Sequence, residues 1–257
     1  MGKRPDVETA PPPLAVSAVA GLGLQLANAI VTVPARRPWE GTASLLDNVG
    51  ASVTHQVLRT FMGYSLGLRV PEFRSMEMVL DAACRVVMPP IVRELGVVSE
   101  VAELGGVPGT WYRPASAPTD GTILYLHGGG YVGTSQNMYA AYTAMLARAS
   151  GCEVFVADYR LAPEFPFPAG LEDAIAVYEA LLASGVDPTR LFVAGDSGGG
   201  GLTNSLIIDA RADHLPDPAG ILLFSPEVDL TLDEPSVTEN AKYDILPWNI
   251  PVGPYLH

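Results

Sequence analysis

The sequence predicts an α/β fold in which a mostly parallel sheet carries helices on both faces. Three observations predict it. From residue 97 onward, short apolar and β-branched runs alternate with segments of helical character, as in sheets built with crossover helices. Two of these runs lead directly into glycine-rich segments, at 127–131 and 195–201. The 257 residues are 48% hydrophobic and 17% charged, so the chain has enough apolar material for the core of one large domain.

The expected elements of this region alternate along the chain. Candidate strands cover 97–101, 110–112, 123–126, 154–157, 191–194 and 221–224. Candidate helices cover 139–149, 171–183 and 202–211. Two further helices are expected at 42–68 and 74–95, with Pro71 as a break between them and Pro89–Pro90 as a break or kink. The chain therefore divides into a flexible leader (1–13), an N-terminal helical region (14–96) and an α/β core (97–257).

Residues 14–33 are uncharged over a length that could span a bilayer. Small and polar residues nevertheless recur along one stripe of this helix, at Ser17, Gly21, Gln25, Asn28 and Thr32. Three interpretations stay open: a helix that packs on the rest of the protein, an interfacial membrane helix, or a true span. We therefore expect a cytoplasmic protein or one that is peripherally membrane-associated through residues 14–33.

Ser197 is the candidate catalytic nucleophile. It lies in Gly195-Asp196-Ser197-Gly198-Gly199, directly after the apolar run 191–194. A G-x-S-x-G segment between a strand and a helix forms a sharp turn that holds the serine hydroxyl above the helix N-terminus. The motif alone is weak evidence, because glycine and serine are common. The strand before it and the helix after it strengthen the prediction.

A second motif, His127-Gly128-Gly129-Gly130-Tyr131, follows the apolar strand 122–126. Three consecutive glycines leave backbone N–H groups uncovered, and such a loop can direct two donors at an oxyanion while the residue after the nucleophile supplies a third. A flexible glycine-rich turn is the plainer interpretation. The position of the motif upstream of Ser197, in the order such sites require, favours the oxyanion loop.

Between these motifs lie Tyr-Arg-Leu-Ala-Pro-Glu (159–164) and Phe-Pro-Phe-Pro-Ala-Gly-Leu-Glu-Asp-Ala (165–174). Together with HGGGY and GDSGGG, in this order and spacing, they make residues 97–257 resemble the hormone-sensitive-lipase-like branch of the α/β-hydrolases. The resemblance implies that the N-terminal helices form a cap. It also implies an oxyanion hole at Gly129, Gly130 and Gly198, loop support from His127 and Gly128, and pocket positions at Tyr131, Asp196, Tyr243 and Trp248. At Gly198 the family usually has alanine.

The resemblance further implies a carboxylic ester hydrolase for short- to medium-chain acyl esters, acting through an acyl-enzyme on Ser197 without a metal or organic cofactor. The fold orders its triad as serine, acid, histidine. In this family the acid follows a seventh strand and the histidine an eighth, and the sequence ends before both. We therefore expect a C-terminally truncated member that lacks its last two strands. Strand 221–224 would then be an apolar edge, open to an oligomer or a C-terminal partner chain.

Local residues are poor substitutes for the missing groups. His214 is expected at the far end of the helix that begins at Ser197, and His257 is terminal. Asp229 follows the sixth strand, one strand too early for the triad acid. Without a base, a serine hydroxyl is a weak nucleophile, so the chain should be weak or inactive by itself. The alternatives are a non-catalytic ligand-binding module and a membrane-associated fragment on the same scaffold.

Charge and cysteine content exclude other classes. The formal net charge of −13 argues against nucleic-acid binding, because phosphates would be repelled. Cys84 and Cys152 form neither a disulfide framework nor a metal-ligand spacing. The partner that the resemblance implies is a small-molecule ester.

Overall fold

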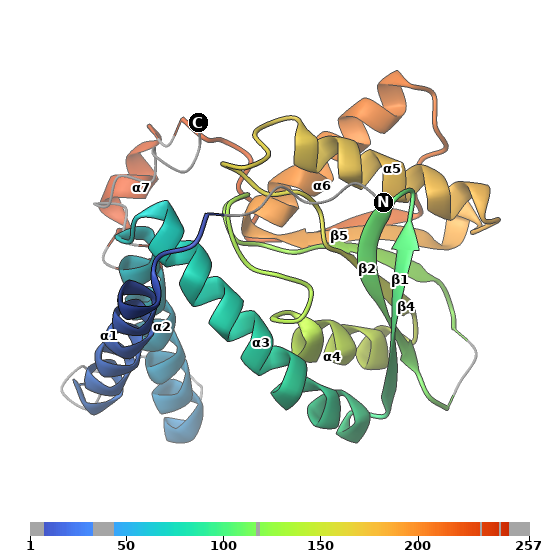
Figure 1. Ribbon diagram of the computed structural model, residues 1–257. Coiled ribbons are helices and arrows are strands. Elements are labelled where there is room, and N and C mark those ends of the chain that lie inside the picture. The colour runs from blue at the N-terminus through green and yellow to red at the C-terminus, as the bar shows by residue number, and fades with distance from the viewer. Residues whose placement is uncertain (1–7, 33–43, 117–118, 232, 242, 247–257) are drawn as a thin grey trace. The chain divides into compact units, whose positions relative to one another are not determined.

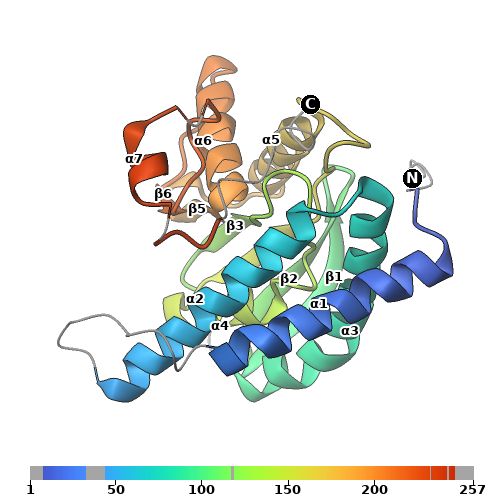
Figure 2. The same cartoon turned by 90° about the vertical axis from the view of Figure 1, so that its left-hand side faces the viewer.

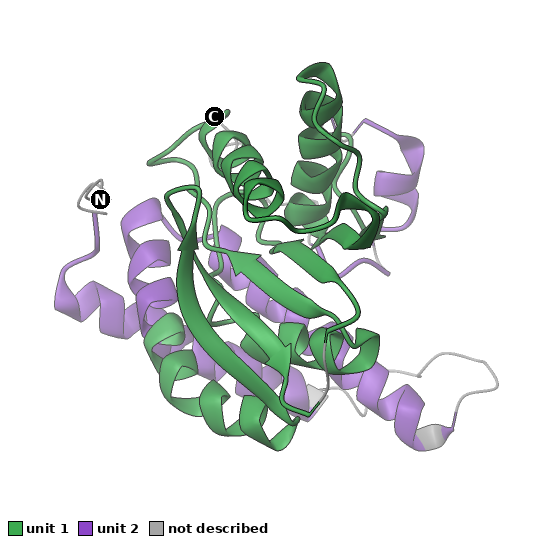
Figure 3. Ribbon diagram, turned by 90° about the vertical axis from the view of Figure 1, so that its right-hand side faces the viewer, with its two compact units in different colours: residues 1–5, 80–230, 255–257 green, residues 6–79, 231–254 purple. Residues whose placement is uncertain are grey.

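The computed structural model describes residues 8–32, 44–116, 119–231, 233–241 and 243–246. The chain divides into two compact units, which Figure 3 distinguishes by colour. Leu80–Leu230 makes up most of the first, here named the sheet unit, and Asp6–Val79 with Thr231–Pro254 makes up the second, the helical unit. Helix α3 (Val70–Glu94) contributes to both units, because the boundary falls within it.

Among the described residues, six strands form one sheet in the order β1-β2-β4-β3-β5-β6. The strands are β1 (Val97–Leu104), β2 (Val107–Pro114), β3 (Thr122–Leu126), β4 (Glu153–Ala157), β5 (Leu191–Asp196) and β6 (Gly220–Phe224). The four strands β4, β3, β5 and β6 are parallel, and β2 joins them antiparallel to both β1 and β4. This arrangement confirms the predicted α/β class, and every predicted strand is present.

Helices cover both faces of the sheet, as Figure 1 shows. Helix α4 (Ala140–Ser150) lies on one face, where its buried alanines pack on apolar side chains of β3 and β4. Helices α5 (Ala169–Ala183) and α6 (Ser197–Ala212) lie on the other face, over side chains such as Phe155 and Leu124. The central strands are apolar on both sides because each face is buried, which explains their continuous hydrophobic runs.

Strand β1 turns into β2 at Gly105–Gly106, and both glycines have positive φ (57° and 81°). Two successive residues with positive φ are characteristic of a two-residue hairpin turn, and residues other than glycine are unfavourable at both. The register runs from Leu104 opposite Val107 to Val97 opposite Pro114. This antiparallel pair forms one end of the sheet, and β6 forms the other.

The helical unit contains α1 (Pro12–Thr32), α2 (Leu45–Leu66), the first part of α3 and the short helix α7 (Pro235–Glu239). Helices α1 and α2 run side by side (Figure 2). The Tyr64 hydroxyl donates to the Ala18 carbonyl at 2.9 Å, and a Cβ on Gly21 would lie 2.3 Å from the Tyr64 hydroxyl oxygen. Small residues on α1 thus let α2 approach closely.

The segment after α7 contacts α2 within the helical unit. Nε2 of His55 lies 2.9 Å from the Tyr243 carbonyl, and Nη1 of Arg59 donates to the carbonyls of Ala241, at 3.0 Å, and Asp244. Helix α7 is not among the helices expected from the sequence.

The structure corrects the predictions for two proline positions. Pro71 does not break the chain between helices; it is the second residue of α3, in the first turn, where a backbone N–H has no helical partner in any case. Pro89 and Pro90 do not end α3, which continues to Glu94.

Part of the predicted leader contacts the helical unit. The Ala10 N–H donates to the Pro71 carbonyl at 3.0 Å and to Ser75 Oγ at 2.9 Å, and helix α1 begins at Pro12. Residues 1–7 of the predicted leader lie outside the described residues.

Helix α1 is the one described helix that is long and apolar enough to cross a membrane, judged by length and composition over Pro12–Val31. Ala18, Leu22 and Ala29 are buried, whereas Val16, Leu24 and Val31 are 67–76% exposed. The helix therefore packs along one narrow face and leaves a broad apolar surface exposed. The sequence alternatives of a packing helix and a membrane-contacting helix are compatible with this arrangement.

Candidate active site

The candidate nucleophile Ser197 begins α6 directly after β5. Its φ is +51°, in the left-handed region that a serine rarely adopts. The strained turn exists because β5 must pass into α6 within one residue, and glycines on both sides make room. A Cβ on Gly195 would lie 2.3 Å from the Gly199 carbonyl oxygen, and one on Gly199 would lie 2.1 Å from the Leu126 carbonyl oxygen. This is the strand–turn–helix geometry that the sequence predicts.

The candidate oxyanion loop leaves β3 and lies against this turn. Gly129, Gly130 and Tyr131 all have positive φ (122°, 58° and 63°), and the Gly129 carbonyl accepts from the N–H groups of Val132 and Gly133. A Cβ on Gly198 would lie 3.1 Å from the backbone nitrogens of Gly130 and Tyr131. The structure therefore brings together Gly130 and Gly198, next to Ser197, as the sequence analysis expects of an oxyanion hole.

His127 lies beneath the loop and is fully buried. Its Nδ1 is 2.9 Å from both the Gly128 carbonyl oxygen and Thr134 Oγ1, and its ring stacks on Tyr159 with centroids 4.5 Å apart. The Tyr159 hydroxyl also donates to the His127 carbonyl at 2.6 Å. His127 thus contacts the start of the loop, its far side and the segment after β4, which is the geometry of a support.

Asp196 was expected in the substrate pocket, and its carboxylate instead contacts the oxyanion loop. It accepts hydrogen bonds from the Tyr125 hydroxyl, the Tyr139 hydroxyl and the Gly128 N–H, at 2.7, 2.7 and 3.0 Å. Neither tyrosine is a candidate site residue from the sequence alone. Tyr125 occurs within an apolar strand and Tyr139 at the start of a helix, and neither position carries a recognisable motif.

Tyr131, another predicted pocket residue, lines a cavity of about 220 Å³ in the sheet unit. The cavity lies between the segment 159–171 and α6, and its walls include Tyr159, Phe165, Phe167, Leu202, Ser205 and Leu230. The hydroxyl of Tyr131 donates to the Glu227 carbonyl at 3.3 Å, and burial, with the charge of Glu227 second, raises the pKa of Tyr131 to about 12. The phenol therefore stays protonated at neutral pH.

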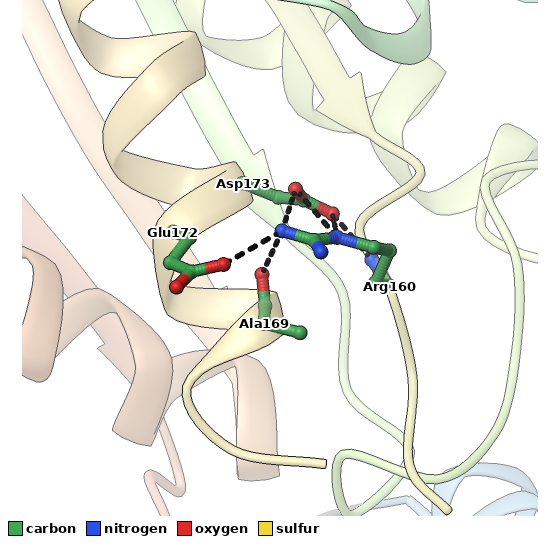
Figure 4. Close-up of polar contacts among 4 residues, drawn as sticks. All are labelled: Arg160, Ala169, Glu172 and Asp173. Atoms are coloured by element: carbon green, nitrogen blue, oxygen red, sulfur yellow. Dashed lines mark hydrogen bonds and ion pairs between the residues drawn. The ribbon is translucent and has the colours of Figure 1, made fainter. Parts of the chain in front are cut away.

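Arg160 lines this cavity, and Figure 4 shows its polar contacts with Ala169, Glu172 and Asp173. Its Nε donates to Asp173 at 2.9 Å, and its Nη2 donates to the Ala169 carbonyl at 3.1 Å and pairs with Glu172 at 3.0 Å. The hydrogen bond with Asp173 is the main cause of a raised pKa for Arg160. The YRLAPE and GLED motifs therefore meet at the N-terminal turn of α5, where their charged residues fix the loop.

Glu227 follows β6 and lies beside the nucleophile turn. Its N–H donates to the Ser197 carbonyl at 2.9 Å. Burial raises the pKa of its carboxyl, and Oε2 is buried without a hydrogen-bond partner among the described residues. Glu227 is not a candidate site residue from the sequence alone.

The sheet unit offers two histidines among its described residues, and neither is placed to activate Ser197. His127 is fully buried beneath the loop. His214 follows the last turn of α6, a helix of 16 residues and therefore about 24 Å long. Tyr243 belongs to the helical unit, where its side chain is exposed, and Trp248 and His257 lie outside the described residues. Among the described residues no cluster of His, Cys, Asp and Glu could hold a metal ion.

Comparisons with known proteins agree with this architecture. A family model described as alpha/beta hydrolase fold matches residues 123–250. An acetyl-hydrolase of Streptomyces hygroscopicus is 39% identical over 148 residues, which are 57% of this chain and 49% of that protein. An esterase of Acinetobacter venetianus is 34% identical over 170 residues, 65% of this chain and 54% of that protein. The chain spans about half the length of these curated relatives.

A solved structure gives the same result at the level of the fold. A hormone-sensitive lipase from a metagenome library is 35% identical, with a TM-score of 0.60, and the match covers 71% of this chain and 67% of that chain. The chain and this solved structure thus share sequence similarity and the fold. The chain belongs to the hormone-sensitive-lipase-like branch of the α/β-hydrolase family.

Proposed function

We propose that this chain carries the nucleophile half of a serine carboxylesterase that acts on short- to medium-chain acyl esters. The observation that carries the proposal is Ser197, held at positive φ at the head of α6 and placed against the loop of Gly129 and Gly130. The acetyl-hydrolase and esterase names of the relatives support the choice of an ester over other substrates.

The proposed reaction has two halves. Ser197 Oγ attacks the ester carbonyl carbon while a base takes its proton, and the carbonyl oxygen becomes an oxyanion. Backbone N–H groups of Gly129, Gly130 and Gly198 stabilise that charge, assisted by the N-terminus of α6. The C–O bond to the alcohol then breaks, the alcohol leaves with the proton, and water repeats the sequence on the acyl-enzyme to release the acid.

Neither described histidine of the sheet unit is placed to act as the base, so the proposal takes the base from outside the described residues of that unit. Loss of a triad member leaves about 10³–10⁴-fold catalysis over water, from the oxyanion hole and binding alone. We therefore expect the chain by itself to hydrolyse p-nitrophenyl acetate slowly. The rate should fall further in Ser197→Ala, and the acetate and butyrate esters should react faster than the decanoate. Equal rates for the chain and Ser197→Ala, on every ester, would refute an acyl-enzyme on Ser197.

The edge of β6 suggests how a base from outside the described residues can be supplied. Among the described residues, strand β6 pairs with β5 on one side only, and Ile221 and Phe224 are about 40% exposed. We propose that a C-terminal fragment of an intact relative, such as the Streptomyces acetyl-hydrolase, pairs with this edge and contributes the acid and histidine. Mixing the two should raise the rate at least tenfold over the sum of the parts, and no gain would contradict the pairing.

A ligand-binding module without catalysis remains the alternative proposal. In that case, a short-chain ester would raise the melting temperature of both the chain and Ser197→Ala, with neither releasing product. The cavity lined by Tyr131 is where such a ligand would be sought.

A further inference from the structure

Asp196 joins the two segments that form the candidate oxyanion hole. It is the last residue of β5 and immediately precedes Ser197. Its Oδ1 accepts from the Tyr125 hydroxyl at 2.7 Å and from the Gly128 N–H at 3.0 Å, and its Oδ2 accepts from the Tyr139 hydroxyl at 2.7 Å. One carboxylate therefore holds three donors from β3, the oxyanion loop and the start of α4.

The surroundings leave this carboxylate little freedom. Tyr125 is fully buried, and its ring lies 5.9 Å from that of Tyr139. The Tyr139 hydroxyl also accepts from the Gly128 N–H at 3.1 Å, so that N–H is shared between phenol and carboxylate. A Cβ on Gly128 would lie 2.4 Å from Asp196 Oδ2. Only a glycine allows the loop to approach this closely.

The hydroxyls of Tyr125 and Tyr139 keep their protons and therefore remain hydrogen-bond donors. Burial, followed by the negative charge of Asp196, raises the pKa of both Tyr125 and Tyr139 far above the ordinary tyrosine value. Hydrogen bonds to an ionised acceptor are about twice as strong as those between neutral groups. The cluster is therefore a strong link between two backbone segments that are far apart in the sequence.

We propose that Asp196 is a positioning residue whose carboxylate, held by Tyr125 and Tyr139, sets the distance between the nucleophile turn and the oxyanion loop. Asp196 acts on one side through its covalent neighbour Ser197 and on the other through Gly128, which precedes Gly129. The N–H groups of Gly129 and Gly130 are thereby held in register with that of Gly198. The inference rests on the proposed esterase function, and it replaces the predicted pocket role of Asp196.

The test compares two tyrosine variants that each lose one buried hydroxyl. Tyr139→Phe removes a donor to Asp196. Tyr178→Phe is the matched control, because the buried Tyr178 hydroxyl donates to the Pro216 carbonyl at 2.7 Å, away from the turn. With p-nitrophenyl acetate, we expect Tyr139→Phe to lower kcat about tenfold with KM unchanged, since a misplaced donor acts on the transition state. Tyr178→Phe should keep its kcat even if its melting temperature falls equally.

Substitution of Asp196 itself gives a graded series. In Asp196→Asn the amide oxygen can still accept from Tyr125 and Gly128, while its NH₂ group can donate to the Tyr139 hydroxyl. Its kcat should therefore lie between wild type and Asp196→Ala, for which we expect a loss of about a hundredfold. Equal kcat values for Tyr139→Phe and Tyr178→Phe, in a chain that is more active than Ser197→Ala, would overturn the inference.

A readout without turnover separates this inference from the proposed function. If wild type is no more active than Ser197→Ala, the proposed function fails, and amide hydrogen exchange measured by NMR decides the role of Asp196. The Gly128 N–H should exchange at least tenfold faster in Asp196→Ala and Tyr139→Phe than in wild type or Tyr178→Phe. Unchanged protection of Gly128 would overturn the inference by itself.

Discussion

Replacement of Gly199 by alanine should destabilise the sheet unit far more than the same change at Gly198. Both glycines are buried in the first turn of α6, and neither has a positive φ. Alanine at either position gains the same helix propensity, about 0.5–1 kcal/mol over glycine. Any difference between the two variants therefore reports on what the new methyl group meets.

The structure gives the two methyl groups different surroundings. On Gly198 the nearest atoms would be backbone atoms of Gly130 and Tyr131 at 3.1 Å, a tight contact that a small shift relieves. On Gly199 the Leu126 carbonyl oxygen would be 2.1 Å away and the His127 carbonyl oxygen 2.5 Å, closer than the 3.0 Å limit of real Cβ contacts. Because these are backbone atoms at the end of β3, α6 must move away from the sheet.

Overpacking of this kind costs about 1–3 kcal/mol and sometimes more. We expect Gly199→Ala to lose about 3 kcal/mol, a fall in melting temperature of about 6–12 °C for a domain of this size. Gly198→Ala should stay within about 1 kcal/mol of wild type, because the gain in helix propensity and the tight contact offset each other.

Thermal unfolding followed by circular dichroism measures both variants. Tryptophan fluorescence of a variant in which Trp39 and Trp248 are replaced by Phe reports on Trp111, which is buried in the core cluster with side chains of α5 and α6, and gives a second probe of the same unit. Equal melting temperatures for Gly198→Ala and Gly199→Ala would refute the close packing of α6 on the end of β3. A large loss for Gly198→Ala alone would refute the placement of the oxyanion loop.

Three further predictions follow from other parts of the chain. Burial raises the pKa of Glu227 above 4.5, so the folded state holds this proton more tightly and loses stability as pH rises through the raised value. Glu227→Gln should therefore gain stability relative to wild type as pH rises above 4.5, measured by urea titrations. Asp173→Asn weakens the pairing with Arg160 and should cost about 1–2 kcal/mol of unfolding free energy in the same titrations. If the exposed apolar face of α1 contacts lipid, the chain should float with zwitterionic vesicles, and Val16→Ser with Leu24→Ser should abolish flotation.

The strands and the two glycine motifs could be predicted because they are local signals. An apolar run such as 122–126, bounded by turn residues, identifies a buried strand without knowledge of its neighbours. Ser197 could be predicted as the candidate nucleophile for the same reason, since consecutive residues form the turn between β5 and α6. The prediction for Pro71 was wrong because a proline that ends one helix and a proline that begins the next have the same sequence signature.

The contacts of Asp196 could not be predicted, because they depend on three segments that meet only in the folded sheet. Strands β3 and β5 are adjacent in space, and this places Tyr125 beside the last residue of β5. Neither the order of the strands nor the register between them follows from the periodicity of one segment. The buried carboxyl of Glu227 was missed for the same reason.

The strand order also has a consequence for how the protein folds. The β1–β2 hairpin, closed at Gly105–Gly106, joins strands that are immediate neighbours in sequence, and isolated hairpins form in about 1–10 μs. The remaining pairings join strands that are distant in the sequence; for example, Thr122 of β3 lies opposite Leu191 of β5. Such non-local contacts slow folding to milliseconds or seconds, because the loop entropy is lost before the contact is gained. Refolding from denaturant should therefore begin with a fast phase, in which the β1–β2 hairpin forms. A slow phase should follow, in which the non-local strand pairs form, and low protein concentration will favour its completion.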